Sequence, residues 1–128
     1  EYLTNKLKIQ DLLDRVTGEL SSGQKNRIAL AKALINKPKV LLLDEPTASL
    51  DPEIGDYVRT FLENYIKENN VSILLASHNM NEVTRLCSSI LMMKDGEIID
   101  SGKPTDLISK HGRENLEEVF LKLAREKV

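Results

Sequence analysis

The stretch Val40-Leu41-Leu42-Leu43-Asp44-Glu45-Pro46 decides the fold of this chain. Its apolar beginning is short, uninterrupted and preceded by a helical pattern, which predicts a strand buried on both faces, as in a parallel sheet. The acidic pair Asp44-Glu45 then stands at the carboxyl end of the predicted strand. Ligands of open parallel sheets gather beyond these strand ends, so the acidic pair is a candidate for chemistry.

The segments after this strand alternate between helical and strand patterns. Asp51 is a suitable N-cap and Pro52 a suitable first residue for a long helix that ends at Asn69-Asn70. The next predicted elements are a buried strand over residues 71–76, a helix over 80–87, a strand over 89–93 and, after a turn at 94–97, a strand over 98–100. This order predicts an α/β fold with a parallel sheet flanked by helices, followed by two more helices after residue 104.

Upstream, Leu20-Ser21-Ser22-Gly23-Gln24 opens another predicted helix, with Ser21 or Ser22 as its N-cap. The apolar face of this helix is predicted to hold Ile28, Ala31, Leu34 and Ile35. A helix start offers backbone N–H groups and the positive end of the helix dipole to a phosphate, and Gly23 permits close approach. An ordinary serine cap has the same sequence, so the phosphate site and the cap both remain open.

Ionisable side chains are predicted to converge at one edge of the sheet. Asp44 and Glu45 follow the first strand, and His78 follows the second. A carboxylate oxygen suits Mg²⁺, a second carboxylate can orient the water that attacks a γ-phosphate, and an imidazole can donate to a phosphate oxygen. We therefore assign Asp44 to the metal, Glu45 to the water and His78 to the phosphate. Taken singly, each segment also fits a polar turn or a helix cap.

Composition narrows the class of protein. The 128 residues predict one domain, or a piece of one, without an internal linker. The net charge of −2 shows no basic excess, so we expect no nucleic acid partner. The single cysteine, Cys87, excludes an internal disulfide and fits a reducing cytoplasm. No apolar run reaches the length of a membrane span. The second histidine of the chain, His111, is interpreted as a residue at a helix end.

Together these segments resemble the ATP-binding cassette (ABC) of ABC transporters. Leu20–Gln24 resembles the signature motif, with Ser22 where Gly is commoner, and residues 40–45 resemble the Walker B strand with its catalytic glutamate. Ser49-Leu50-Asp51 is similar to the D-loop, and His78 is similar to the switch histidine. The order and spacing of these motifs are specific to the family, and residues 80–87 and 93–98 follow its pattern as well.

The resemblance implies a partial P-loop NTPase fold. Residues 1–38 would be the C-terminal part of the helical subdomain with the signature motif, 39–102 part of the RecA-like core, and 103–128 the C-terminal helices. It also implies Mg²⁺-dependent ATP hydrolysis at the cytoplasmic face of a membrane, with permease subunits and a second, head-to-tail cassette as partners. The residues implied to reach the partner's nucleotide are Ser21, Ser22, Gly23 and Gln24, with Asp51 at the same interface. Residues 115–121 are similar to the end of exporter ATPase subunits.

One family segment does not occur in this sequence, the Gly-x-x-x-x-Gly-Lys-Ser/Thr loop called Walker A. In the family it precedes the signature motif, together with the glutamine-bearing loop and the aromatic residue that stacks on adenine, and this chain begins after them. The Walker A strand would lie between the strands at 71–76 and 89–93, so we expect a gap in the sheet. Unpaired edges and uncovered apolar faces seek partners, so we expect the isolated chain to self-associate. We also expect it to bind ATP weakly and to be inactive alone.

Two other functions remain open. A cassette ATPase of chromosome maintenance, DNA repair or translation works without a membrane partner, but it predicts a basic stripe or heptads, and neither is visible. A truncated, non-catalytic cassette would act as an interaction module by lending its signature motif to a complete one.

Overall fold

The chain forms two compact units. The computed structural model describes residues 2–126. The first unit ends at Ala76 and the second begins at Ser77, and the expectation of one domain, or a piece of one, remains a prediction. The three-part division at residues 38 and 102 separates segments by role and remains a prediction.

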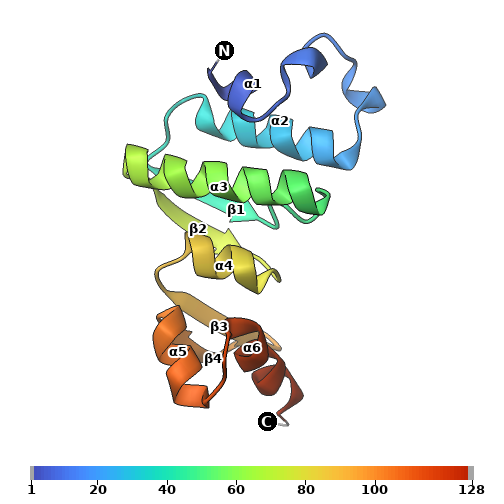
Figure 1. Ribbon diagram of the computed structural model, residues 1–128. Coiled ribbons are helices and arrows are strands. Elements are labelled where there is room, and N and C mark those ends of the chain that lie inside the picture. The colour runs from blue at the N-terminus through green and yellow to red at the C-terminus, as the bar shows by residue number, and fades with distance from the viewer. Residues whose placement is uncertain (1, 127–128) are drawn as a thin grey trace. The chain divides into compact units, whose positions relative to one another are not determined.

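The first unit is built around a parallel pair of strands (Figure 1). Its elements are α1 (Tyr2–Lys6), the 3₁₀ helices η1 (Gln10–Leu12) and η2 (Thr17–Glu19), α2 (Ser22–Leu34), β1 (Val40–Asp44), α3 (Pro52–Asn69) and β2 (Ser72–Ala76). Asp44 pairs with Ala76 at the carboxyl ends of β1 and β2. The Glu45 N–H then donates to the Ala76 carbonyl at 2.8 Å. The ends of both strands therefore lie at one edge, as the sequence predicts.

Helix α3 confirms its predicted start and end. The Asp51 carboxylate accepts from the Ile54 N–H at 3.0 Å, and Pro52 is the first helical residue. Asn70 closes the helix in the left-handed conformation, with φ of 52°. The buried face of α3 consists of Gly55, Val58, Phe61, Leu62 and Tyr65. Cap, first-turn proline and left-handed terminator are all local signals, which explains why the sequence defines this helix so well.

The segment before α2 is fastened to both long helices of the first unit. The Arg27 guanidinium donates to the carbonyl oxygens of Leu7 and Lys8, at 3.3 and 3.2 Å. The Lys8 ammonium lies 4.1 Å from the ring centroid of Tyr57 on α3, a cation–π distance. Leu7 is fully buried. These contacts give the N-terminal segment a defined position although its helices are short.

Strand β1 is buried on one face only, and β2 is half-buried on one face and exposed on the other. Leu41 and Leu43 are buried, whereas Val40 is 61% and Leu42 71% exposed, and Leu74 of β2 is 65% exposed. The prediction of strands buried on both faces is therefore wrong for residues 2–126. The physical reason is that no described element covers the second face. Ile35 is also 63% exposed rather than inward, because α2 ends before it.

The second unit combines a hairpin with three helices (Figure 1). Its elements are α4 (Met80–Leu86), β3 (Ile90–Lys94), β4 (Glu97–Gly102), α5 (Pro104–His111) and α6 (Leu116–Arg125). Strands β3 and β4 are antiparallel, and the turn between them places Asp95 and Gly96 at positive φ. This confirms the predicted turn.

The third predicted strand does not join the parallel sheet. Within residues 2–126, β1 and β2 form one sheet and β3 and β4 another. Strands β2 and β3 belong to different units, so the gap that we expect at the Walker A strand remains a prediction. Among the described residues, β3 pairs with β4 alone, and its place in the parallel sheet of a complete cassette remains a prediction.

The core of the second unit draws on all three helices and on β3. Its buried apolar residues are Val83, Leu86, Ile90, Met92, Leu107, Leu116, Val119 and Leu123. The stripe Leu116, Val119 and Leu123 on α6 confirms the predicted packing face.

Among the described residues, no helix is long and apolar enough to cross a bilayer.

Candidate functional site

The start of α2 is closed by a reciprocal cap. The Gln24 N–H donates to the Ser21 hydroxyl at 3.2 Å, and the Ser21 N–H donates to the Gln24 side-chain oxygen at 3.0 Å. Of the two candidate caps, the structure therefore selects Ser21, and Ser22 becomes the first helical residue. Both serines are exposed. Two of the predicted nucleotide contacts, Ser21 and Gln24, thus hold the helix start in place.

The helix start contacts the segment that precedes α3. A Cβ atom added at Gly23 would lie 3.2 Å from the Ser49 carbonyl oxygen and 3.1 Å from the Leu50 Cδ2. The Asn26 side-chain amide donates to the Ser49 hydroxyl. Two motifs that the sequence analysis treated separately are therefore in direct contact. Gly23 gains a packing role, since the Ser49 backbone occupies the space where a side chain would begin.

The turn after β1 fixes the acidic pair. Asp44 is exposed, and Glu45 is partly buried with a left-handed φ of 47°, uncommon for a residue other than glycine. Thr47 is buried, and its hydroxyl accepts from the Arg59 guanidinium of α3 at 3.0 Å. The Ala48 N–H closes the turn on the Glu45 carbonyl at 3.3 Å. Bonds to β2 and α3 thus hold Glu45 in a strained backbone conformation.

Asp51 is placed at the same corner of the first unit. It directly follows Leu50, which contacts Gly23, and its side chain is exposed. One carboxylate oxygen accepts from the Ile54 N–H and caps α3. The helix cap is therefore an established role of Asp51 in the structure, and the interface role remains a prediction.

His78 belongs to the second unit. It is exposed and lies between Ser77 and Asn79, directly before α4. The Asn79 side chain caps α4 by accepting from the Glu82 N–H at 3.0 Å. The predicted convergence of His78 with Asp44 and Glu45 joins residues of different units and remains a prediction.

The described residues contain no cluster of three or more His, Cys, Asp or Glu side chains that could hold a metal ion. Asp44 nevertheless fits Mg²⁺, since it presents an exposed carboxylate at a strand end. Mg²⁺ is commonly bound through one or two carboxylates, substrate phosphates and waters. A dedicated protein cage for this ion is therefore not required.

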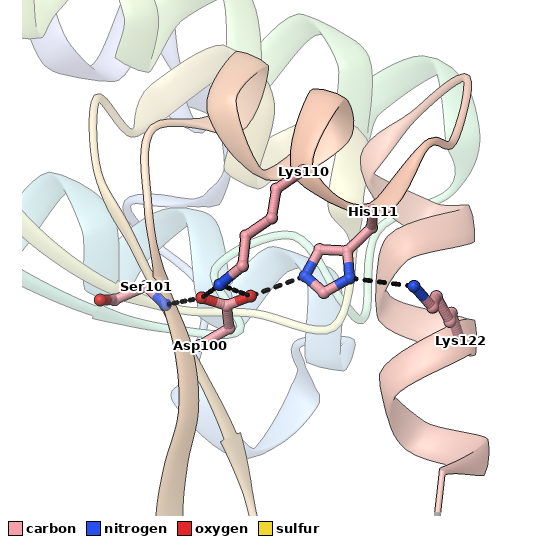
Figure 2. Close-up of polar contacts among 5 residues, drawn as sticks. All are labelled: Asp100, Ser101, Lys110, His111 and Lys122. Carbon is pink, nitrogen blue, oxygen red and sulfur yellow. Dashed lines mark hydrogen bonds and ion pairs between the residues drawn. The ribbon is translucent and has the colours of Figure 1, made fainter.

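A polar network in the second unit was missed by the sequence analysis (Figure 2). The Asp100 carboxylate lies 2.6 Å from His111 Nε2 and also accepts from the Lys110 ammonium and the Ser101 N–H. The hydrogen bond from His111 and those from Lys110 lower the pKa of Asp100 to about 2. His111 was interpreted only as a helix-end residue. No local signal reveals the network, because its members come from three different elements.

The network also defines the protonation of His111. The Lys122 ammonium, which can only donate, lies 3.3 Å from His111 Nδ1. Nδ1 therefore accepts, and Nε2 carries the hydrogen that it donates to Asp100. The side chains of His111 and Asp100 are only 10% and 8% exposed. This arrangement ties β4, α5 and α6 together within the second unit.

A pair of parallel strands, the first ending in an acidic pair beside a capped helix start, fits a partial α/β fold of the P-loop NTPase class. Residues 1–48 match the family model described as ABC transporter. ABC transporter G family member 20 of Dictyostelium discoideum is 37% identical, over 98% of this chain and 18% of its own length. Methionine import ATP-binding protein MetN 1 of Bacillus anthracis is 41% identical, over 80% of this chain and 31% of its own length. The chain belongs to the ABC transporter ATPase family.

Solved structures agree with this assignment. A dimeric, post-hydrolysis state of the ATP-binding cassette MJ0796 bound to ADP and Pi is 31% identical, with a TM-score of 0.67 over 77% of this chain and 44% of that one. An ATP-binding subunit of an ABC transporter matches in fold, with a TM-score of 0.80 at 23% identity, over 97% of this chain and 52% of that one. The chain thus spans less than a third of the length of the curated relatives named above.

Proposed function

We propose that this chain is the C-terminal part of the ATP-binding subunit of an ABC transporter, and that the complete subunit hydrolyses ATP at the cytoplasmic face of a membrane. The observation that carries the proposal is the acidic pair at the end of β1, with Glu45 held at positive φ. A general base needs a fixed direction toward the water that it activates. The bonds that hold the turn from Glu45 to Ala48 supply that rigidity.

Each site residue then has a separate role. Asp44 would hold Mg²⁺, which when bound neutralises charge on the phosphates. Glu45 orients the attacking water and accepts its proton, and His78 donates from its ring to a γ-phosphate oxygen. The exposed ring of His78 and the exposed carboxylate of Asp44 are both accessible to a ligand.

The start of α2 serves a second nucleotide. We assign Ser21, Ser22, Gly23 and Gln24 to the ATP bound by a partner cassette. The exposed serines, the backbone of Gly23 and the positive end of the α2 dipole are suited to a phosphate. The contact between Gly23 and Ser49 links this surface to Asp51, which we place at the same interface. The dimeric MJ0796 cassette supports a paired arrangement.

Export is the direction of transport that we propose. It rests on residues 115–121, which are similar to the end of exporter ATPase subunits. Vesicles that contain the complete transporter would distinguish the directions by the side on which substrate accumulates.

Substitution of Glu45 in the complete subunit tests the catalytic proposal. Glu45→Gln should abolish hydrolysis while ATP binding persists, because the amide cannot accept the proton. Glu53→Gln is the matched control, since Glu53 is an exposed carboxylate in the first turn of α3. Unchanged hydrolysis in Glu45→Gln would overturn the proposal.

Three further observations separate the alternatives. The 128-residue chain alone should show no micromolar affinity for ATP by isothermal titration, because its sequence contains no Walker A loop. Adding the chain to a complete cassette should leave hydrolysis unchanged if it is part of a subunit, whereas a rise would favour the interaction module. A complete protein that purifies without any membrane partner would favour the cassette ATPase that is not coupled to transport.

A further inference from the structure

A buried carboxylate stands beside the exposed histidine of the second unit. Glu82 is 1% exposed, although it lies on α4 only four residues after His78. Burial of a carboxylate is unfavourable unless its oxygens accept hydrogen bonds. The Ser77 hydroxyl donates to Glu82 Oε2 at 2.6 Å, a short bond typical of a charged acceptor.

The same serine is bonded on its other side. The Asn79 N–H donates to the Ser77 hydroxyl oxygen at 3.0 Å, and the Asn79 side chain accepts from the Glu82 N–H at 3.0 Å. These bonds form a closed network of Ser77, Asn79 and Glu82. His78 lies in the sequence between Ser77 and Asn79, two members of this network. The backbone on both sides of the imidazole is therefore fixed to α4.

The helix cap alone does not account for Glu82. Asn79 already caps α4 through the backbone of residue 82, so any residue there would be capped equally. The Glu82 side chain instead accepts from the Ser77 hydroxyl. Burial of the Cys87 thiol raises the pKa of Cys87, and the nearby negative charge of Glu82 raises it further. The buried Glu82 side chain is therefore directed at Ser77, the residue next to His78.

We propose that Glu82, acting through Ser77, is a positioning residue that fixes the direction of the His78 ring. The inference rests on the proposed function of His78 as the donor to the γ-phosphate. In this role neither Glu82 nor Ser77 needs to contact the nucleotide. Their part is to hold His78 in the orientation that the transition state requires, because small misplacements of a donor lower the rate strongly.

Histidine ring NMR on the 128-residue chain tests the positioning directly. The sequence has two histidines, so His111→Gln assigns both ring signals. Ser77→Ala and Glu82→Ala should average the His78 ring signals over several orientations. Ser77→Thr and Glu82→Gln should retain the native signals, since each keeps a group that can form the Ser77–Glu82 bond. Thr84→Ala is the matched control, because the Thr84 hydroxyl bonds only the Met80 carbonyl among the contacts resolved on α4.

Turnover in the complete subunit provides the second readout. Ser77→Ala should lower kcat by roughly 10-fold to 100-fold with KM for ATP nearly unchanged, and Ser77→Thr should restore it. If His78→Ala leaves hydrolysis intact, the proposed function of His78 fails while the ring measurement still decides the positioning. If the His78 ring is as ordered in Ser77→Ala and Glu82→Ala as in the unsubstituted chain, while Ser77→Ala also keeps full turnover, the positioning is refuted. Should Glu82→Ala fail to fold, Ser77→Ala decides alone.

Discussion

His111 Nε2 lies 2.6 Å from the Asp100 carboxylate, although the two residues belong to different elements of the second unit. Lys122 fixes the tautomer of this imidazole from the opposite side. Neither His111 nor Asp100 is among the residues that we assign to nucleotide chemistry. The pair therefore provides a stability test of the second unit that is independent of function.

Acid should destabilise the second unit through Asp100. The pKa of Asp100 is lowered from 3.8 to about 2, so its contribution to stability is fully present above pH 3.8 and is lost as the pH falls toward 2. A ¹³C titration of the carboxyl carbon should give a midpoint near 2. His111→Gln should raise this midpoint more than Lys110→Met, because the His111 bond is the larger cause. A midpoint near 3.8 in the unsubstituted chain would contradict the network.

Removal of the α2 cap should weaken the first unit. Ser21→Ala eliminates the acceptor for the Gln24 N–H, and loss of an N-cap costs about 1 kcal/mol. Ser22→Ala provides the control, since Ser22 is an exposed helical residue and does not cap α2. Urea denaturation followed by circular dichroism measures both. Equal losses in the two variants would show that the cap is unimportant.

A side chain at position 23 should disturb the segment before α3. Gly23→Ala places a methyl group 3.2 Å from the Ser49 carbonyl oxygen, so the backbone must shift, and overpacking of this kind costs roughly 1–3 kcal/mol. Gly18→Ala is the control, because nothing lies within 4 Å of its added Cβ. Thermal unfolding compares the two, and amide chemical shifts of residues 49–51 locate the change. Unaltered shifts there would exclude the contact.

The uncovered face of β1 and β2 should cause the isolated chain to associate. Val40, Leu42 and Leu74 are exposed apolar residues on these paired strands, and contiguous exposed apolar surface favours association. Sedimentation velocity should show species larger than a monomer. Leu42→Glu should reduce association, whereas Glu53→Gln on α3 should not. A stable monomer of the unsubstituted chain at high concentration would refute this expectation.

Local signals explain which parts of the fold the sequence predicts. Helix α3 is correct at both ends because its cap, its first-turn proline and its terminator are adjacent in the chain. The burial of β1 is predicted wrongly. An apolar run indicates that a strand is suited to packing on both faces, but it does not indicate whether other helices or strands cover both faces. The pairing of β3 with β4, in contrast, follows from a local signal, the turn that contains Asp95 and Gly96.

The candidate site also contains features that the sequence predicts and features that it does not. Asp44, Glu45 and Asp51 lie at the strand end and helix start where the pattern places them. The contact between Gly23 and Ser49, and the burial of Glu82, depend on tertiary packing and have no periodic signature. Glu82 stands three residues after the cap Asn79, a spacing that indicates a capping box and was the one available hint.

The close approach of Gly23 to the Ser49 carbonyl has a consequence for sequence variation among relatives of this chain. A larger residue at position 23 is tolerated only if the loop at 49 and 50 retreats, so substitutions at these sites should occur jointly. A relative with a substitution at position 23 should therefore also carry a compensating substitution at position 49 or 50. Mutational libraries that randomise positions 23, 49 and 50 together should recover pairs that neither site accepts alone.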